Sequence, residues 1–172
     1  MKEEILDIKN SIISGKGVFA KKLISKGETI CFMEGELMSL DEMINRVDSN
    51  LENGSDPLGV DDETYLDLEE LPRSINHSCC PNAFIKGKNE LIALKNINKG
   101  EEITYDYSTT MDDNREKIES TGGTLWTIKC RCGNKDCRKR INQFKTLPFE
   151  KQRYYIENKL APDFILKKFS KN

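Results

Sequence analysis

Arg73-Ser74-Ile75-Asn76-His77-Ser78-Cys79-Cys80-Pro81-Asn82 is the run of residues that says most about this chain. It holds the single histidine and two of the six cysteines, and it ends in a turn-forming Pro-Asn pair. Two further dense stretches follow it: Gly100-Glu101-Glu102-Ile103-Thr104-Tyr105-Asp106-Tyr107 and Cys130-Arg131-Cys132-Gly133-Asn134-Lys135-Asp136-Cys137. Each stretch alone could arise by chance, but all three in this order point to a function.

The length and composition bound the kind of protein. A chain of 172 residues fits one domain with its own core and a small appendage. Only 37% of the residues are hydrophobic and 33% are charged, so we expect a metal to supply part of the stability. No apolar run approaches the ~20 residues of a membrane helix, and the first residues lack the apolar core of a secretory signal. We therefore expect no membrane contact and a location inside the cell, in cytoplasm or nucleus, or in a host cell if the source is a pathogen. In such a reducing compartment, clustered cysteines favour a metal over disulfides.

The net charge of −2 hides two blocks of opposite sign. Residues 34–70 contain thirteen Asp or Glu against a single Arg, whereas residues 129–172 contain thirteen Lys or Arg against four acidic residues. Each block could be a solvated face, but the acidic one would also attract a cationic protein or peptide. The basic block has no interleaved aromatic stripe, which argues against nucleic-acid binding. Oligomeric state leaves no signal in the sequence.

Glycine-punctuated runs of strand-forming residues predict a mainly β fold. We expect a capped helix from Ser39 to about Val47, a helix or loop over 112–120, and short helices at 148–158 and 162–169, each with proline in its first turn. Turns are expected at Asn53-Gly54 and at Gly87-Lys88-Asn89, the latter joining a hairpin. The expected strands are 11–14, 18–20, 29–33, 64–68, 83–85, 91–94 and 103–107.

Cys130, Cys132 and Cys137 supply three thiolates within eight residues, and the Gly-Asn turn between them lets both arms face one ion. Structural zinc takes four ligands in a tetrahedron, so one more ligand must come from elsewhere in the chain. The candidates are Cys31, Cys79, Cys80 and His77.

Other patterns admit more than one interpretation. His77 and Cys79 could form a catalytic pair, but residues this close in sequence rarely reach the required geometry. Gly15-x-Gly17 continues into a strand, which argues against a dinucleotide site. Tyr105 and Tyr107 are two apart on a predicted strand and would face the same side, either in the core or in a site.

Taken together, these residues resemble the SET-domain family of AdoMet-dependent protein-lysine methyltransferases. The resemblance covers about residues 10–140 in the family's order. It implies a β-clip-like fold of short strands with a threaded C-terminal segment. It also implies a SET domain over 5–110 with a short acidic insert at 35–63, a post-SET zinc element at 125–141, and a helical tail at 145–172. The matching stretches are 15–20, 65–67, 73–82, 100–107 and the cysteine cluster.

The resemblance also implies roles for individual residues. Cys79 would be the fourth zinc ligand, Tyr107 the catalytic tyrosine, and Tyr105 the position at which tyrosine limits the product mainly to monomethyl-lysine. Trp126 would lie over the adenine of S-adenosyl-L-methionine or, as readily, pack in the core. The residues expected to bind that cofactor are Lys16, Gly17, Phe19, Tyr65, Arg73, Asn76, His77 and Trp126.

We therefore expect an enzyme that methylates a lysine of a basic protein, such as a histone. Two alternatives from other classes remain open: a zinc-stabilised interaction module that keeps the fold without the activity, and a purely structural zinc protein. The second would leave the tyrosine and glycine patterns unexplained.

Overall fold

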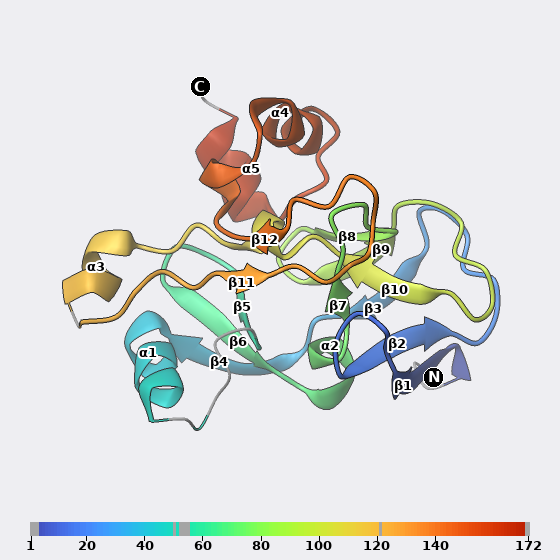
Figure 1. The fold of residues 1–172 in the computed structure, drawn as a ribbon, viewed down its shortest axis with the longest axis horizontal. Helices are drawn as coiled ribbons and strands as arrows, with labels where there is room; N and C mark the ends of the chain where they lie inside the picture. Colours follow the sequence, from blue (N-terminus) through green and yellow to red (C-terminus); the bar gives the residue numbers. More distant parts are fainter. Residues whose placement is uncertain (1–3, 50, 52–55, 121, 171–172) are drawn as a thin grey trace.

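The computed structural model describes residues 4–49, 51, 56–120 and 122–170, and it is built mainly of short β-strands, as predicted (Figure 1). The turn expected at Asn53-Gly54 lies outside the described residues. Among those residues, no helix combines the length and apolar character needed to cross a membrane.

The first sheet holds the central run of the sequence. Its order is β1 (Leu6–Asn10), β2 (Lys16–Ala20), β10 (Glu102–Tyr105) and β7 (Asn76–His77). β7 and β10 are parallel, with Thr104 opposite Asn76 and Tyr105 opposite His77. Two of the three informative stretches thus become neighbouring strands.

The prediction of a strand at 11–14 is wrong, because that segment is the loop of the β1–β2 hairpin. The Ser11 side chain accepts a hydrogen bond from the Ile13 backbone, and Gly15 takes a positive φ of 46°. Ile12 is fully exposed at the tip. Two consecutive isoleucines look like strand in sequence, but here they only pass over a turn.

Two further sheets have three strands each. One has the order β3 (Thr29–Phe32), β9 (Glu90–Ala93) and β8 (Ala83–Lys86), with the predicted hairpin turn at Gly87. The other is β4 (Gly35–Ser39), β6 (Thr64–Leu68) and β5 (Pro57–Gly59). All three sheets contribute to one apolar core, to which Val18, Ile30, Leu66, Leu91 and Ile103 belong.

Helices are few and short, as predicted. α1 (Leu40–Asp48) begins where expected, because the Ser39 hydroxyl accepts a hydrogen bond from the Glu42 backbone. α2 (Glu70–Arg73) leads into β7, and α3 (Arg115–Ser120) follows the last strand of the first sheet. β11 (Ile128–Lys129) and β12 (Arg140–Ile141) form a two-stranded ribbon around the cysteine cluster.

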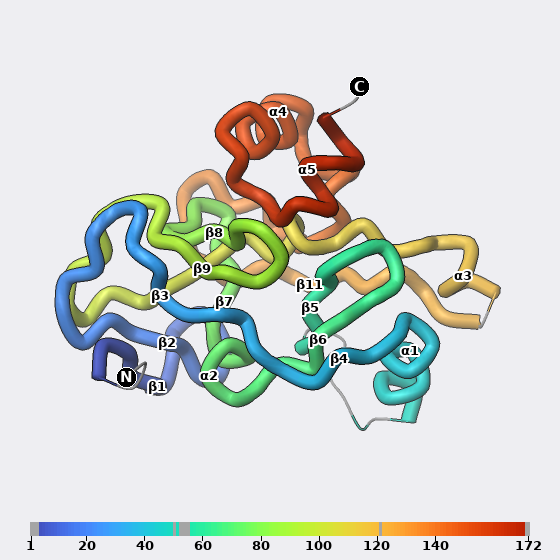
Figure 2. Tube along the Cα trace, turned by 180° about the vertical axis from the view of Figure 1, so that it is seen from behind, coloured from blue at the N-terminus to red at the C-terminus, as the bar shows by residue number. Residues whose placement is uncertain are grey.

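The chain ends in two helices, α4 (Phe149–Glu157) and α5 (Asp163–Phe169), which lie together beside β8 (Figures 1 and 2). Each helix begins one residue later than predicted, so Pro148 and Pro162 are N-caps and not residues of the first turn. The helices share a buried cluster with Phe84 of β8; its fully buried members include Phe144, Tyr155 and Ile165. The C-terminal helices are therefore packed onto the β structure and do not extend away from it.

Candidate functional site

Two cavities meet at Tyr107 and Trp126, which line both of them. The smaller has a volume of about 360 Å³ and lies among the hairpin loop, β7 and the ribbon. The larger, of about 480 Å³, lies among α1, β6 and the segment after β10. The two volumes fall within the range of ligand pockets.

Asn76 holds the hairpin loop onto β7. Its amide nitrogen donates to the backbone oxygens of Ser14 (3.1 Å) and Lys16 (2.8 Å) and to Glu102 Oε1 (2.8 Å). Gly17 makes room for this carboxylate, since a Cβ there would lie 2.3 Å from Glu102 Oε1. The amide group of Asn76 thus shapes the smaller cavity through the loop it holds.

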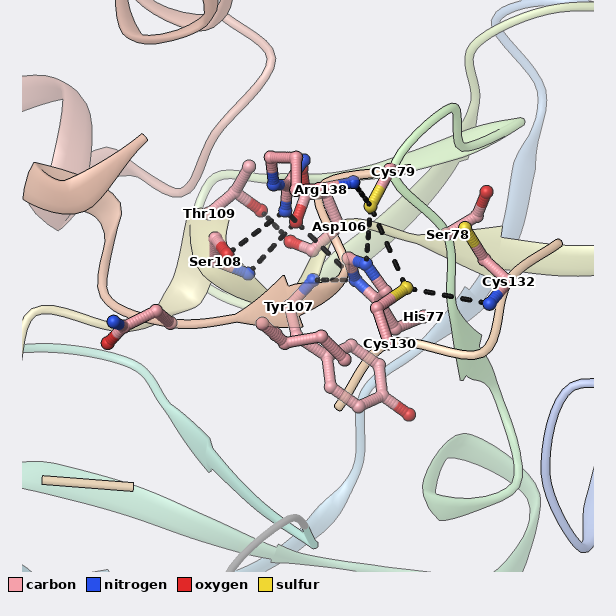
Figure 3. Close-up of polar contacts among 12 residues, drawn as sticks. His77, Ser78, Cys79, Asp106, Tyr107, Ser108, Thr109, Cys130, Cys132 and Arg138 are labelled. Carbon is pink, nitrogen blue, oxygen red and sulfur yellow. Dashed lines mark hydrogen bonds and ion pairs between the residues drawn. The ribbon is translucent and has the colours of Figure 1, made fainter. Parts of the chain in front are cut away.

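His77 connects the strand pair to the cysteine cluster (Figure 3). Its Nδ1 accepts a hydrogen bond from the Tyr107 backbone at 3.1 Å, so the ring proton lies on Nε2, which is 3.4 Å from Cys79 Sγ. Burial lowers the pKa of His77 to about 4, although the Asp106 carboxylate nearby acts in the opposite direction. The neutral imidazole therefore donates to the Cys79 sulfur and is not a general base.

The sulfurs of Cys79, Cys130, Cys132 and Cys137 all lie within 4.8 Å of one another. Cys79 and Cys130 are 3.7 Å apart at sulfur, close to the ~3.8 Å edge of a tetrahedron with zinc–sulfur bonds of about 2.3 Å. Backbone N–H groups of Arg138 and Lys139 point at the Cys79 and Cys137 sulfurs, each at 3.4 Å. The donor set fits a structural zinc ion, and of the four candidates for the fourth ligand the geometry selects Cys79.

Asp106, which sequence analysis missed, is the buried charge beside this cluster. Arg138 donates to both of its oxygens at 2.7 Å (Figure 3). The Tyr155 hydroxyl donates to Oδ2 at 2.8 Å. Burial alone raises the pKa of Asp106, but hydrogen bonds from Arg138 and the charge of that guanidinium lower it below its usual range. The only signal in the sequence was the place of Asp106 between two tyrosines, which carries no information about partners 32 and 49 residues away.

Tyr105 ends β10, and Tyr107 begins a short 3-10 helix (Tyr107–Thr110) capped by the Asp106 side chain, which accepts from the Ser108 N–H. The strand predicted to run through Tyr107 therefore stops two residues early, yet the two tyrosine rings still lie 4.8 Å apart. The Tyr107 hydroxyl donates to the Ile75 carbonyl at 2.7 Å. Burial raises the pKa of both phenols, so both stay protonated at neutral pH.

The structure brings most of the predicted cofactor residues to one place. Lys16 and Arg73, at the edge of the smaller cavity, also form ion pairs with Glu70 (2.8 Å) and Asp67 (2.6 Å). Trp126 lines the cavity and also packs against the cysteine cluster, and its contact with an adenine stays a prediction. The predicted residues lining this cavity are Lys16, Arg73, Asn76, His77 and Trp126.

Three predicted residues lie elsewhere. Tyr65 lines the larger cavity, where its hydroxyl donates to Asp113 Oδ1 at 2.6 Å. Gly17 and Phe19 are not among the residues lining either cavity, and the Phe19 ring lies beside the Lys9 ammonium. Sequence analysis missed the cavity residues around the clustered cysteines, because their spacing follows no recognised pattern: Ile128, Lys129, Arg131 and Ile141.

The site belongs to a mainly β domain. In it the Asn-His-Ser-Cys run lies beside a pair of tyrosines and a four-thiol cluster, and two cavities share one wall. Comparison with known sequences identifies the class: the SET domain profile matches residues 15–108, and the chain belongs to this family.

Several relatives are named histone-lysine N-methyltransferases. The chain is 32% identical to trithorax of Drosophila virilis over 152 residues, covering 81% of this chain and 4% of that protein. It is also 32% identical to Su(var)3-9 of Drosophila melanogaster, covering 73% of this chain and 23% of that protein. Among solved structures, KRYPTONITE in complex with mCHH DNA, H3(1-15) peptide and SAH matches with a TM-score of 0.60 and 25% identity, over 79% of this chain and 29% of that one. The chain thus corresponds to a small part of these longer relatives.

Proposed function

We propose that this protein is an AdoMet-dependent protein-lysine N-methyltransferase that mainly adds one methyl group to a lysine of a basic protein. The observation that carries the proposal is the shared wall of Tyr107 and Trp126 between two cavities. A cofactor in one cavity and a lysine side chain in the other would meet at this wall.

The residues of the smaller cavity fit S-adenosyl-L-methionine. Lys16, Arg73 and Arg131 offer cationic donors for its carboxylate, and the Trp126 ring offers an apolar face for its adenine. When bound, the cofactor supplies a methyl group on a positively charged sulfur. The relatives named above and the SAH in the KRYPTONITE complex support this assignment.

The larger cavity suits a lysine side chain and the residues around it. Tyr65, Tyr105, Tyr107 and Trp126 give it an aromatic lining, and its charged residues, Asp48 and Asp113, are both acidic. An apolar, partly enclosed site favours the neutral form of an amine, which the reaction requires. Acidic residues at the site also favour approach of a cationic protein segment.

Tyr107 would orient the amine. Its hydroxyl hydrogen is donated to the Ile75 carbonyl, so the lone pairs of the oxygen are free to accept a hydrogen bond from the lysine nitrogen. Because its pKa is raised, the phenol holds its proton and does not act as the base. We assign removal of the lysine proton to water, and to Tyr107 the alignment on which an in-line transfer depends.

Tyr105 is the basis for proposing monomethylation. Its buried ring lies against that of Tyr107, and its hydroxyl can hold a water in the space that a larger, methylated amine would need. The proposed substrate is a histone tail or another lysine-rich protein, and the proposed place of action is the nucleus, which the histone-related names of the relatives support.

Calorimetry with AdoMet followed by a methyl-transfer assay on histone H3 peptides and on lysate proteins tests the proposal. Binding together with transfer to lysine is the expected result. An absence of binding at high micromolar AdoMet would contradict the enzyme assignment. Binding without transfer to any lysine would favour the alternative of a catalytically inactive interaction module.

A further inference from the structure

The segment that carries Tyr107 is held from behind by the C-terminal part of the chain. This segment, residues 106–113, lines the larger cavity with Tyr107, Thr110, Met111 and Asp113. On its other side lie residues 142–169, which include α4 and α5. In Figure 2 the C-terminal helices lie on the opposite side of the β structure from α1, which borders the same cavity.

Tyr155 of α4 provides the first contact. Its ring is buried in the C-terminal cluster, and its hydroxyl donates to Asp106 Oδ2, the carboxylate that also caps the 3-10 helix beginning at Tyr107. A neutral donor on a buried charge makes a strong, well-directed hydrogen bond. The helix tail is thereby connected to the residue directly before the proposed catalytic tyrosine.

Gln143 provides the second contact. It is fully buried and pairs with Asp113 twice: its Oε1 accepts from the Asp113 N–H at 2.7 Å, and its Nε2 donates to Asp113 Oδ2 at 2.8 Å. The other carboxylate oxygen of Asp113 accepts from the Tyr65 hydroxyl. Gln143 therefore orients two side chains of the larger cavity from outside it.

Two further contacts complete the attachment. The Phe144 N–H donates to the Met111 carbonyl at 2.7 Å. Lys168 of α5 pairs with Asp112, and also with Asp62 at 3.0 Å on the loop before β6. Residues 106, 111, 112 and 113 are thus each bonded to the C-terminal part of the chain.

We propose that residues 142–169 brace the catalytic segment, and that Tyr155 and Gln143 are positioning residues for methyl transfer. This inference rests on the proposed function. Neither side chain lines a cavity that would hold substrate or cofactor, so each acts through Asp106 or Asp113. A shift of the Tyr107 oxygen by about 1 Å is enough to cost a rate factor on the order of 100.

The test compares Tyr155→Phe with Tyr154→Phe in the whole 172-residue chain. Both variants lose one phenol oxygen from α4. Residue Tyr154 is 43% exposed, and its ring contacts are with Lys151 and Tyr155 of the same helix. We expect Tyr155→Phe to lower kcat about tenfold with the AdoMet Kd changed less than about twofold, and to speed amide hydrogen exchange in residues 107–113 about tenfold. Tyr154→Phe should match the wild type in all three measurements. Gln143→Met, which keeps the side-chain volume, should lower kcat by a similar or larger factor.

The proposal is overturned if Tyr155→Phe lowers only the melting temperature while kcat per folded molecule and exchange in residues 107–113 stay within about twofold of Tyr154→Phe. Failure of the proposed function looks different: the wild type itself would transfer no methyl group. In that case hydrogen exchange alone decides, and unchanged exchange in Tyr155→Phe rejects the brace.

Discussion

Replacing Cys79 by serine should weaken cofactor binding as well as metal binding. Cys79 lies three residues after Asn76, and its sulfur contacts both the His77 imidazole and the Arg138 backbone. A structural zinc site of this kind contributes about 10–16 kcal/mol of binding free energy in small peptides. If the four thiolates share it equally, losing one costs about 2.5–4 kcal/mol, or roughly a 100- to 1,000-fold loss of zinc affinity.

The consequence for the cofactor follows from the composition of the smaller cavity. Five of its fifteen lining residues belong to the segment 126–141, which a metal held by the four thiols would order. Without the metal, this third of the wall loses its support, including Trp126 and Arg131. We therefore expect the AdoMet Kd to rise at least about tenfold, the equivalent of about 1.4 kcal/mol.

Calorimetry with AdoMet, alongside zinc quantification and thermal unfolding, checks this expectation. Cys80→Ser is the matched control, because Cys80 is the next residue and lies outside the thiol cluster. Adding a chelator to the wild type should reproduce the Cys79→Ser result and unfold the C-terminal third first. A Cys79→Ser protein that has lost its metal and still binds AdoMet as tightly as Cys80→Ser would refute the coupling.

Three further predictions concern the residues around Tyr107. Tyr107→Phe should lower kcat by about 100- to 1,000-fold. It should lower the free energy of unfolding by only about 1–3 kcal/mol, because the buried Ile75 carbonyl loses its hydrogen-bond donor. An unchanged kcat would show that Tyr107 takes no part in the reaction. Tyr105→Phe should shift the product towards di- and trimethyl-lysine in mass spectra, and a product that stays monomethyl would contradict the role of its hydroxyl. Asp106 has a lowered folded-state pKa, so its contribution to stability is present above the ordinary Asp pKa of ~3.9 and is lost as pH falls below it. Urea unfolding of the wild type between pH 2 and 7 should show this loss of stability. Asp106→Asn should abolish this pH dependence and lower the free energy of unfolding by about 3–5 kcal/mol at pH 7, because Arg138 is left as an unpaired buried charge. Equal pH profiles for the two proteins would contradict the role of Asp106.

Features encoded by neighbouring residues were predicted well. The N-cap at Ser39, the hairpin around Gly87 and the two C-terminal helices depend on contacts within a few residues, and all three are present. The exceptions are also local: the Ile12-Ile13 pair was taken for strand, and Tyr107 was placed in one. In both cases the extended conformation ends where a side-chain oxygen, of Ser11 or of Asp106, accepts a hydrogen bond from a backbone N–H two residues later.

The sequence by itself determined the family and indicated a cysteine cluster that could hold a metal. Three features can be recognised from residue types at short spacing, when they occur in the right order along the chain. They are the Asn-His-Ser-Cys run, the tyrosine pair and the three clustered cysteines. The limits proposed for the domains remain predictions of that kind.

Only the tertiary structure decided which residues act together. It placed Tyr65 at the larger cavity, left Phe19 away from both cavities, and joined Asp106 to Arg138 and Tyr155. It also brought the Cys79 sulfur to the other three, as the family resemblance implied. The physical reason is that burial and long-range hydrogen bonds depend on how distant segments pack, and no spacing along the chain records that packing.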